Sequence, residues 1–124
     1  MIVVDVGVIV ELLVNDIEPQ RIGAEALAAP YLLDSEVANA LRRLVLRSVL
    51  TENQGAKAMD GFGELYLERF GARPLLPRMW ELRHNLSAYE ATYVVLAEVL
   101  DLSLVTTDTR MVNATGPGCS IRLL

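Results

Sequence analysis

Two short apolar runs that end in an aspartate constrain the fold of this chain most strongly. The first run is MIVVD at residues 1–5, and the second is LSLVTTD at residues 102–108. Runs that are apolar throughout, rather than alternating, are typical of strands buried on both faces of a parallel sheet. Because segments with helical patterns lie between them, we expect an α/β fold: a parallel β-sheet flanked by α-helices and connected by right-handed crossovers.

Apolar spacing and capping signals predict the remaining elements. Thr51-x-x-Gln54 and Ser87-x-x-Glu90 resemble capping boxes, in which two residues at a helix start exchange side-chain and backbone hydrogen bonds. Two further strands are expected at residues 72–76 and 119–124. Helices are expected at residues 6–14, 18–28, 78–85 and 91–100, and Pro77 opens the third of these. A further helix is expected to begin after Asp34 or Ser35 as N-cap and to continue towards residue 50. Another is expected from residue 52 towards Phe70, with a bend or break at Gly61 and Gly63.

Length and composition favour one globular domain over residues 1–124. Hydrophobic residues make up 52% of the chain and charged residues 22%, and no apolar run reaches the roughly 18 residues that a membrane span needs. The first residues lack the basic region of a signal peptide, so we expect a cytoplasmic protein without a membrane partner. His84 and Cys119 are the only histidine and cysteine, which excludes a disulfide framework and a Cys/His zinc site. Cys119 is expected to be a small buried apolar residue.

The charge balance argues against a protein that holds nucleic acid by phosphate contacts alone. The net charge is −5 and the isoelectric point is about 4.8, whereas such proteins present a broad basic face. Ten of the eleven cationic residues are nevertheless arginines, and Lys57 is the one lysine. Arginine suits bidentate contacts with phosphate or carboxylate, so a phosphate ligand remains open.

Asp5 and Asp108 are the first candidates for a functional site. Each follows an apolar strand, and ligands of open parallel sheets bind outside the carboxyl ends of the strands. A carboxylate that faces a core is unfavourable unless it is paired or bound to a metal. The alternative for each acid is a structural one, because an aspartate after a strand is often the N-cap of the next helix.

Other chemistries of parallel sheets lack their motifs in this sequence. No G-x-G-x-x-G follows the first strand, and neither a P-loop motif nor G-x-S-x-G occurs anywhere. An aspartyl phosphotransferase would need a second acid two residues after Asp5, where this chain has Gly7. The chemistry that remains is that of carboxylates, which suits hard cations such as Mg²⁺ or Mn²⁺.

The chain resembles the PIN-domain ribonucleases, and most of all the VapC toxins of toxin–antitoxin pairs. Four stretches carry the resemblance in order and spacing: MIVVD, LLDSEVANALRR, WELRHNLSAYEATYVVLAEVL and LVTTDTRM. The resemblance implies a single PIN-like domain over residues 1–124, with an acidic pocket at the carboxyl edge of the sheet. By position, the family's acidic quartet falls on Asp5, Glu36, Glu90 and Asp108, and Thr106 matches the family's hydroxyl just before the last acid.

This resemblance implies a metal-dependent endoribonuclease that acts as the toxin of a type II pair. Asp5 and Asp108 are expected to be direct or near-direct ligands of Mg²⁺ or Mn²⁺, with Glu36 and Glu90 completing the cluster or holding metal-bound waters. The site could hold one ion or two. The expected partners are an RNA substrate, a cognate VapB-type antitoxin and a second copy in a homodimer, for which the mean hydropathy of +0.34 leaves apolar surface. No motif identifies the RNA or the position of the cut.

Two positions depart from the family pattern. Gly7 lies where the family usually has Ser or Asn, so a hydrogen bond that would orient a metal ligand or its water is missing. Glu90 lies where Asp is the norm, and as the third residue after Ser87 it could serve only as the acid of a capping box. These departures leave an alternative function open: a PIN-like binding module with weak or no catalysis.

Several further residues have both a functional and a structural interpretation. Arg42 and Arg43 follow Glu36 on the same predicted helix, where they could guide RNA phosphates or form an ordinary solvated face. His84 is interpreted as complementing the dipole at a helix end. Trp80 and Tyr89 are expected in the core or an interface rather than as platforms for stacking bases.

Overall fold

A computed structural model describes residues 1–15, 22 and 26–124 of the chain. Its described part contains one five-stranded, all-parallel sheet with the strand order β3-β2-β1-β4-β5. The strands are β1 (Ile2–Val4), β2 (Leu27–Pro30), β3 (Glu68–Phe70), β4 (Leu104–Thr106) and β5 (Ile121–Leu123). The expected α/β fold class is therefore confirmed.

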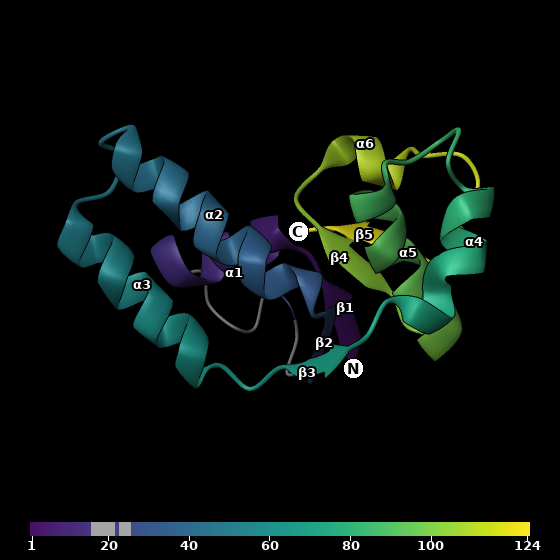
Figure 1. The fold of residues 1–124 in the computed structure, drawn as a ribbon, viewed down its shortest axis with the longest axis horizontal. Helices are drawn as coiled ribbons and strands as arrows, with labels where there is room; N and C mark the ends of the chain where they lie inside the picture. The colour runs from purple at the N-terminus through teal and green to yellow at the C-terminus, as the bar shows by residue number, and fades with distance from the viewer. Residues whose placement is uncertain (16–21, 23–25) are drawn as a thin grey trace.

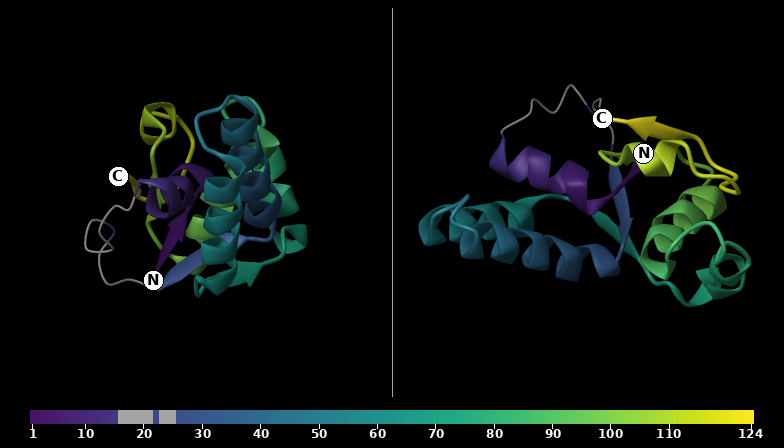
Figure 2. Two further views of the ribbon diagram at one scale, coloured as in Figure 1. Left: turned by 90° about the vertical axis from the view of Figure 1, so that its left-hand side faces the viewer. Right: turned by 90° about the horizontal axis from the view of Figure 1, so that it is seen from above.

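Helices cover both sides of this sheet (Figure 1, Figure 2). The group α1, α2 and α3 lies on one side, with α2 and α3 packed as a hairpin, and α5 lies on the other side against β1, β2 and β4. The short α6 lies beside β4 and β5, and α4 packs on α5. The helices are α1 (Val6–Val14), α2 (Leu32–Leu46), α3 (Glu52–Glu64), α4 (Leu76–Glu81), α5 (Ala88–Leu100) and α6 (Thr109–Val112), preceded at α4 by a short 3-10 turn, η2 (Arg73–Leu75).

The strand order places a topological switch point between β1 and β4. From β1 the chain continues through β2 to β3 in one direction, and β4 then adds on the other side of β1 and leads outward to β5. The helices that follow β1 and β4 therefore leave the sheet in different directions, which opens a crevice at the carboxyl ends of these two strands. Asp5 follows β1 and Asp108 follows β4 by two residues, so both lie at this crevice.

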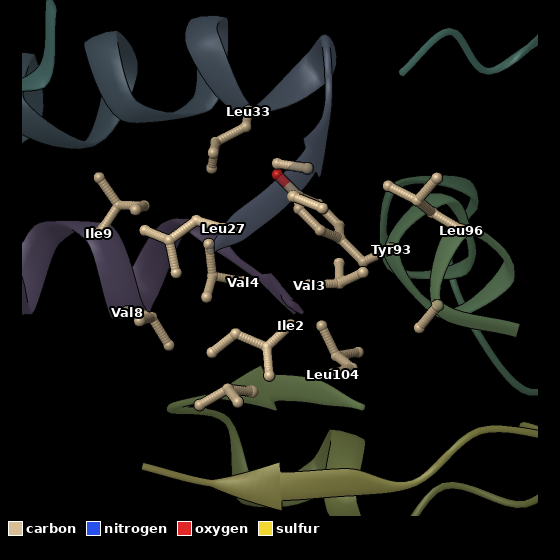
Figure 3. Packing of buried hydrophobic residues seen from close by; sticks show 14 of the residues in the cluster. Ile2, Val3, Val4, Val8, Ile9, Leu27, Leu33, Tyr93, Leu96 and Leu104 are labelled. Atoms are coloured by element: carbon tan, nitrogen blue, oxygen red, sulfur yellow. The ribbon is translucent and has the colours of Figure 1, made fainter. Parts of the chain in front are cut away.

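The core explains why the two central strands read as apolar throughout. Val3 pairs with Leu104 and Val4 with Val105, and all four side chains are buried because helices cover both faces. Figure 3 shows one polar atom within this cluster, the hydroxyl of Tyr93, which reaches from α5 past β1 and points towards α2.

The expected helix at 18–28 and the expected strand at 72–76 are wrong where the structure describes them. Leu27 and Ala28 belong to the buried strand β2, and most of the rest of 18–28 lies outside the described residues. Residues 73–75 form the turn η2 and lead into α4, because two prolines fit the first positions of these turns and only Leu75 is buried. Strand β3, at one edge of the sheet, lies instead within the stretch expected to be helical as far as Phe70.

Helix starts and ends follow the local signals with one exception. Both capping boxes, at Thr51 and at Ser87, are confirmed, and α3 stops short of Phe70, one residue after Gly63. Helix α2 begins at Leu32 rather than after Asp34 or Ser35. Asp34 does not cap it because its carboxylate pairs with Arg69 of β3, with 2.9 Å between Nε and Oδ1.

Several side chains of the second half of the chain differ from expectation. Trp80 and Tyr89 are 68% and 64% exposed, so neither belongs to the core. The guanidinium of Arg83 lies over the Trp80 ring and donates to the Trp80 carbonyl at the end of α4. Cys119 is half-buried rather than buried, and burial raises the pKa of its thiol. None of the helices within the described ranges has the length and apolar character needed to cross a membrane.

Candidate active site at the carboxyl edge of the sheet

The crevice at the switch point is a pocket of about 540 Å³ lined by residues from four separate parts of the chain. All four acids expected at the site contribute to its lining, although their positions range from 5 to 108. The walls of the pocket are formed by the start of α1, the first half of α2, the start of α5 and the segment from β4 into α6. The structure thus places Asp5, Glu36, Glu90 and Asp108 around one cavity.

Asp5 is the N-cap of α1 and also faces the pocket. Its Oδ1 accepts a hydrogen bond from the backbone N–H of Val8 at 3.2 Å, and its Oδ2 accepts one from the hydroxyl of Thr106. Burial raises the pKa of Asp5, and the negative charge of Asp108 adds to that rise, while the bonds from Thr106 and Val8 oppose it. Asp5 therefore caps α1, and its carboxylate also remains poorly solvated. A nearby cation stabilises a carboxylate most strongly under this condition.

Thr106 connects the two acids that follow the central strands. Its side chain is fully buried at the end of β4, where the hydroxyl donates to Asp5 and accepts from the backbone N–H of Asp108 at 3.0 Å. One hydroxyl therefore fixes the orientation of the first acid and the backbone of the last.

Asp108 is the N-cap of α6 and already has a cationic partner. Its Oδ1 accepts from the backbone N–H of Arg110 at 2.9 Å, and its Oδ2 lies 2.9 Å from the Arg110 guanidinium. These contacts hold the pKa of Asp108 below its usual value. The Arg110 side chain is 82% exposed, so the ion pair lies at the rim of the pocket and water can replace it easily.

Glu36 lies on α2 and is held from across the sheet by Tyr93. The Tyr93 hydroxyl donates to Glu36 Oε1 at 2.5 Å. Burial, followed by the bond to Glu36 and the negative charges nearby, raises the pKa of Tyr93 far above its usual value. The phenol therefore stays protonated and acts as a fixed donor that orients the Glu36 carboxylate.

Glu90 is the acid of the capping box at the start of α5 and also lines the pocket. Its Oε1 accepts from the backbone N–H of Ser87 at 2.9 Å, and its own N–H donates to the Ser87 hydroxyl at 3.1 Å. The capping interpretation is confirmed for this side chain. The second oxygen of the carboxylate is left for the pocket.

Arg42 and Arg43 do not line the acidic pocket. Both are exposed on α2, and Arg42 borders a separate groove between α2 and α3. Sequence reasoning overlooked Tyr93, Thr107 and Arg110, which do line it. One signal was available for Tyr93, because it brings a hydroxyl-bearing ring into the apolar run at residues 91–100, one helical turn after Glu90.

The donor atoms of the pocket fit a hard divalent cation, although they do not form a closed cluster. Its side chains offer carboxylate and hydroxyl oxygens, the ligands that Mg²⁺ and Mn²⁺ prefer. Across 1–15, 22 and 26–124, no three acidic, histidine or cysteine side chains converge on one point. The reason is visible in the contacts: Glu36, Glu90 and Asp108 are each turned towards a protein partner. Ion binding would draw them away from these partners.

The fold and the pocket together define a class: doubly wound α/β proteins that gather acids at the switch point of a parallel sheet. Comparisons with known proteins identify the family within that class. No family model matches the sequence. Ribonuclease VapC9 of Mycobacterium tuberculosis is 42% identical over 125 residues, an alignment that spans 100% of this chain and 98% of that protein. VapC ribonuclease Mb0985 of Mycobacterium bovis matches with the same identity and coverage.

A similar solved structure supports the fold. The crystal structure of PAE2754 from Pyrobaculum aerophilum has a TM-score of 0.74 and covers 97% of this chain and 81% of its own, at 21% identity, which concerns the fold alone. The family is assigned from the sequence identity to named relatives over the full length of the chain. The chain belongs to the VapC ribonuclease family, and the resemblance to PIN-domain proteins is confirmed.

Proposed function

We propose that this protein is a metal-dependent endoribonuclease that acts as the toxin of a type II toxin–antitoxin pair. Its substrate is RNA, and its site is the acidic pocket, with Asp5, Glu36, Glu90 and Asp108 holding Mg²⁺ or Mn²⁺. The observation that carries the proposal is that four acids far apart in the sequence line one pocket at the switch point, and that Asp5 among them is desolvated. The ribonuclease names of full-length relatives support the same activity.

The residues of the pocket have separate tasks in this proposal. A bound divalent ion supplies a water activated near neutral pH and positive charge for the phosphoryl oxygens. Asp5 is preset for that ion, because Val8 and Thr106 fix its carboxylate in one orientation. Tyr93 does the same for Glu36, since its hydroxyl restricts the rotation of that longer side chain. Such preorganisation lowers the cost of assembling the site.

The contact between Asp108 and Arg110 suggests how an antitoxin inhibits the site. A guanidinium already lies against one acid of the pocket, so an arginine from a VapB-type antitoxin can pair with the others in the same way.

We further propose a homodimer that uses the exposed apolar side chains near α4, including Trp80 and Tyr89. We also propose that the protein acts in the cytoplasm, where RNA and antitoxin meet.

A cleavage assay on total RNA tests the proposed function. Wild-type protein is incubated with Mg²⁺, Mn²⁺ or EDTA, the cut ends are mapped, and Asp5→Asn serves as the inactive control. The proposal requires discrete cuts that depend on the metal and on Asp5. Cuts that persist in EDTA or in Asp5→Asn would show a contaminating nuclease or a different mechanism.

A second function is favoured by one observation, the absence of a closed cluster of acids in the described residues. If the partners of Glu36, Glu90 and Asp108 outcompete a cation, the chain is a binding module that retains the antitoxin surface without efficient catalysis. This alternative predicts tight association with a cognate VapB-type antitoxin and no Mg²⁺-dependent rise in melting temperature. A metal-dependent rise that Asp5→Asn abolishes favours the enzyme.

A further inference from the structure

The first turn of α1 lacks a side chain at Gly7, and Thr107 fills the space. A Cβ built on Gly7 would lie 3.2 Å from Thr107 Cβ and 3.4 Å from Thr107 Cγ2, and the Thr107 hydroxyl oxygen would be closer still, well inside contact distance. Any side chain at position 7 therefore requires Thr107 to move. The two residues occupy one site in space although 100 positions separate them in the sequence.

The backbone does not explain the glycine. Gly116 is the one described glycine with positive φ, and Gly7 has ordinary helical geometry, which alanine or serine adopts with ease. A glycine within a helix is unfavourable relative to alanine. The close approach of Thr107 is thus the feature of the structure that accounts for a missing side chain at this position.

The Thr107 hydroxyl lies against Gly7 at the edge of the acidic pocket, and the Thr107 residue is exposed. Gly7 and Thr107 both line the pocket, beside Asp5 and Asp108. The neighbouring Thr106 uses its hydroxyl fully, on Asp5 and on the Asp108 backbone, whereas no hydrogen bond joins the Thr107 side chain to any residue in the described part of the chain. The pocket thus has no side chain at position 7 of α1 and has the Thr107 hydroxyl beside that position.

We propose that Thr107 is a positioning residue whose hydroxyl takes the place of a side chain at position 7. It hydrogen-bonds the water that the carboxylates hold around the divalent cation, and Gly7 provides the room for it. This role rests on the proposed function, and it is an alternative to the expectation that Gly7 leaves a metal ligand or its water without an orienting hydrogen bond. It predicts that positions 7 and 107 are energetically coupled.

Calorimetric titration of Mn²⁺ tests the role of the hydroxyl apart from catalysis. Thr107→Val keeps the shape and removes the hydroxyl, so its Mn²⁺ affinity should fall about tenfold or more, as second-sphere losses commonly do. Thr107→Ser keeps the hydroxyl and should bind like wild type. The exchange variant Gly7→Ser/Thr107→Ala returns a hydroxyl from α1 and should recover most of the affinity that Thr107→Ala loses.

Thermal unfolding without metal tests the shared space independently. Gly7→Ala should lower the melting temperature in the wild-type background, and this penalty should shrink or reverse when Thr107 is alanine, a non-additivity expected of residues in contact. Equal effects in the two backgrounds would overturn the spatial coupling, and wild-type Mn²⁺ affinity in Thr107→Val would overturn the role of the hydroxyl alone. Wild-type protein that binds no Mn²⁺ would overturn the proposed function and, with it, that role.

Discussion

The two acids at strand ends and the two acids on helices are held in the pocket in different ways. Asp5 and Asp108 have short side chains on backbone that the central strands fix, and Thr106 ties them together. Glu36 and Glu90 have longer side chains, and each is oriented by one hydrogen bond, from the Tyr93 hydroxyl or from the Ser87 backbone. The strand acids are placed by topology, whereas the helix acids are placed by a single partner.

This difference indicates a division of labour within the pocket. Asp5 is desolvated and has a raised pKa, so it gains most from a cation. The glutamates can rotate away from their partners and adjust to an ion or to a substrate phosphate. We therefore expect substitutions of strand acids to abolish activity and substitutions around the helix acids to tune it.

The largest effect is expected for Asp5→Asn. The amide is nearly isosteric but lacks the charge that binds a hard cation, so Mg²⁺-dependent cleavage should fall by more than about 100-fold. The fold should be kept, because the amide oxygen can still accept from the Val8 N–H and the amide nitrogen can donate to the Thr106 hydroxyl in place of the bond that Asp5 accepts. Cleavage rate and circular dichroism measured on the same preparation check both statements. Substantial residual activity would place the metal elsewhere.

Substitutions of Glu90 distinguish its role as a helix cap from its role in the pocket. Glu90→Gln keeps an oxygen for the Ser87 N–H, so the melting temperature should hardly change while cleavage falls about 10- to 100-fold. Glu90→Asp shortens the side chain to the family's usual acid and should keep or raise activity. Glu90→Ala should cost about 1 kcal/mol of stability as well as activity. A fully active Glu90→Gln protein would leave Asp5, Glu36 and Asp108 as the site.

Tyr93→Phe tests whether one hydrogen bond is enough to set a helix acid. Removing the hydroxyl frees the half-buried Glu36, so cleavage should fall about tenfold and the free energy of unfolding by about 1 kcal/mol. Tyr66→Phe is the matched control, because Tyr66 is exposed and lies outside the pocket. Kinetics and urea unfolding of both variants give the comparison. Equal behaviour of the two variants would remove Tyr93 from the positioning of Glu36.

The smallest effect concerns the pH dependence of stability without metal. The pKa of Asp5 is higher in the folded protein than in the unfolded chain, so its favourable contribution is fully present below the unfolded pKa and is lost as pH rises through the folded pKa. Asp5→Asn should remove this loss and be the more stable protein at pH 7. Urea unfolding of both proteins from about pH 4 to 7 measures the difference. Parallel curves would mean that Asp5 is not strained by burial.

The sequence predicts those parts of the fold whose signals are local. The apolar runs at β1 and β4 and the capping boxes at Thr51 and Ser87 depend on neighbours within a few residues, and the structure has them where expected. The edge strand β3 gave no such signal, because only one of its faces is covered and its residues Glu68–Phe70 are polar or half-exposed. Its strand character comes from pairing with β2, which is a tertiary effect.

The candidate site shows the same limit. Asp5 and Asp108 could be proposed because each follows an apolar strand, whereas Glu36 and Glu90 were proposed from the resemblance to a known family. Their partners could not, because Tyr93 meets Glu36 across 57 positions and Thr107 meets Gly7 from the far end of the chain. A departure such as Gly7 looks like a loss in the sequence, and only the packing shows that Thr107 fills the space beside it.

The bond between Thr106 and Asp5 also determines when, during synthesis, the pocket can exist. These residues are 101 positions apart, and β4 enters the sheet next to the first strand to be made. A nascent chain that has emerged only as far as α5 therefore holds Asp5, Glu36 and Glu90 without the strand that orients the first of them. The pocket is complete only after β4 has emerged and docked beside β1, so the three acids that precede β4 do not form the finished pocket before that step.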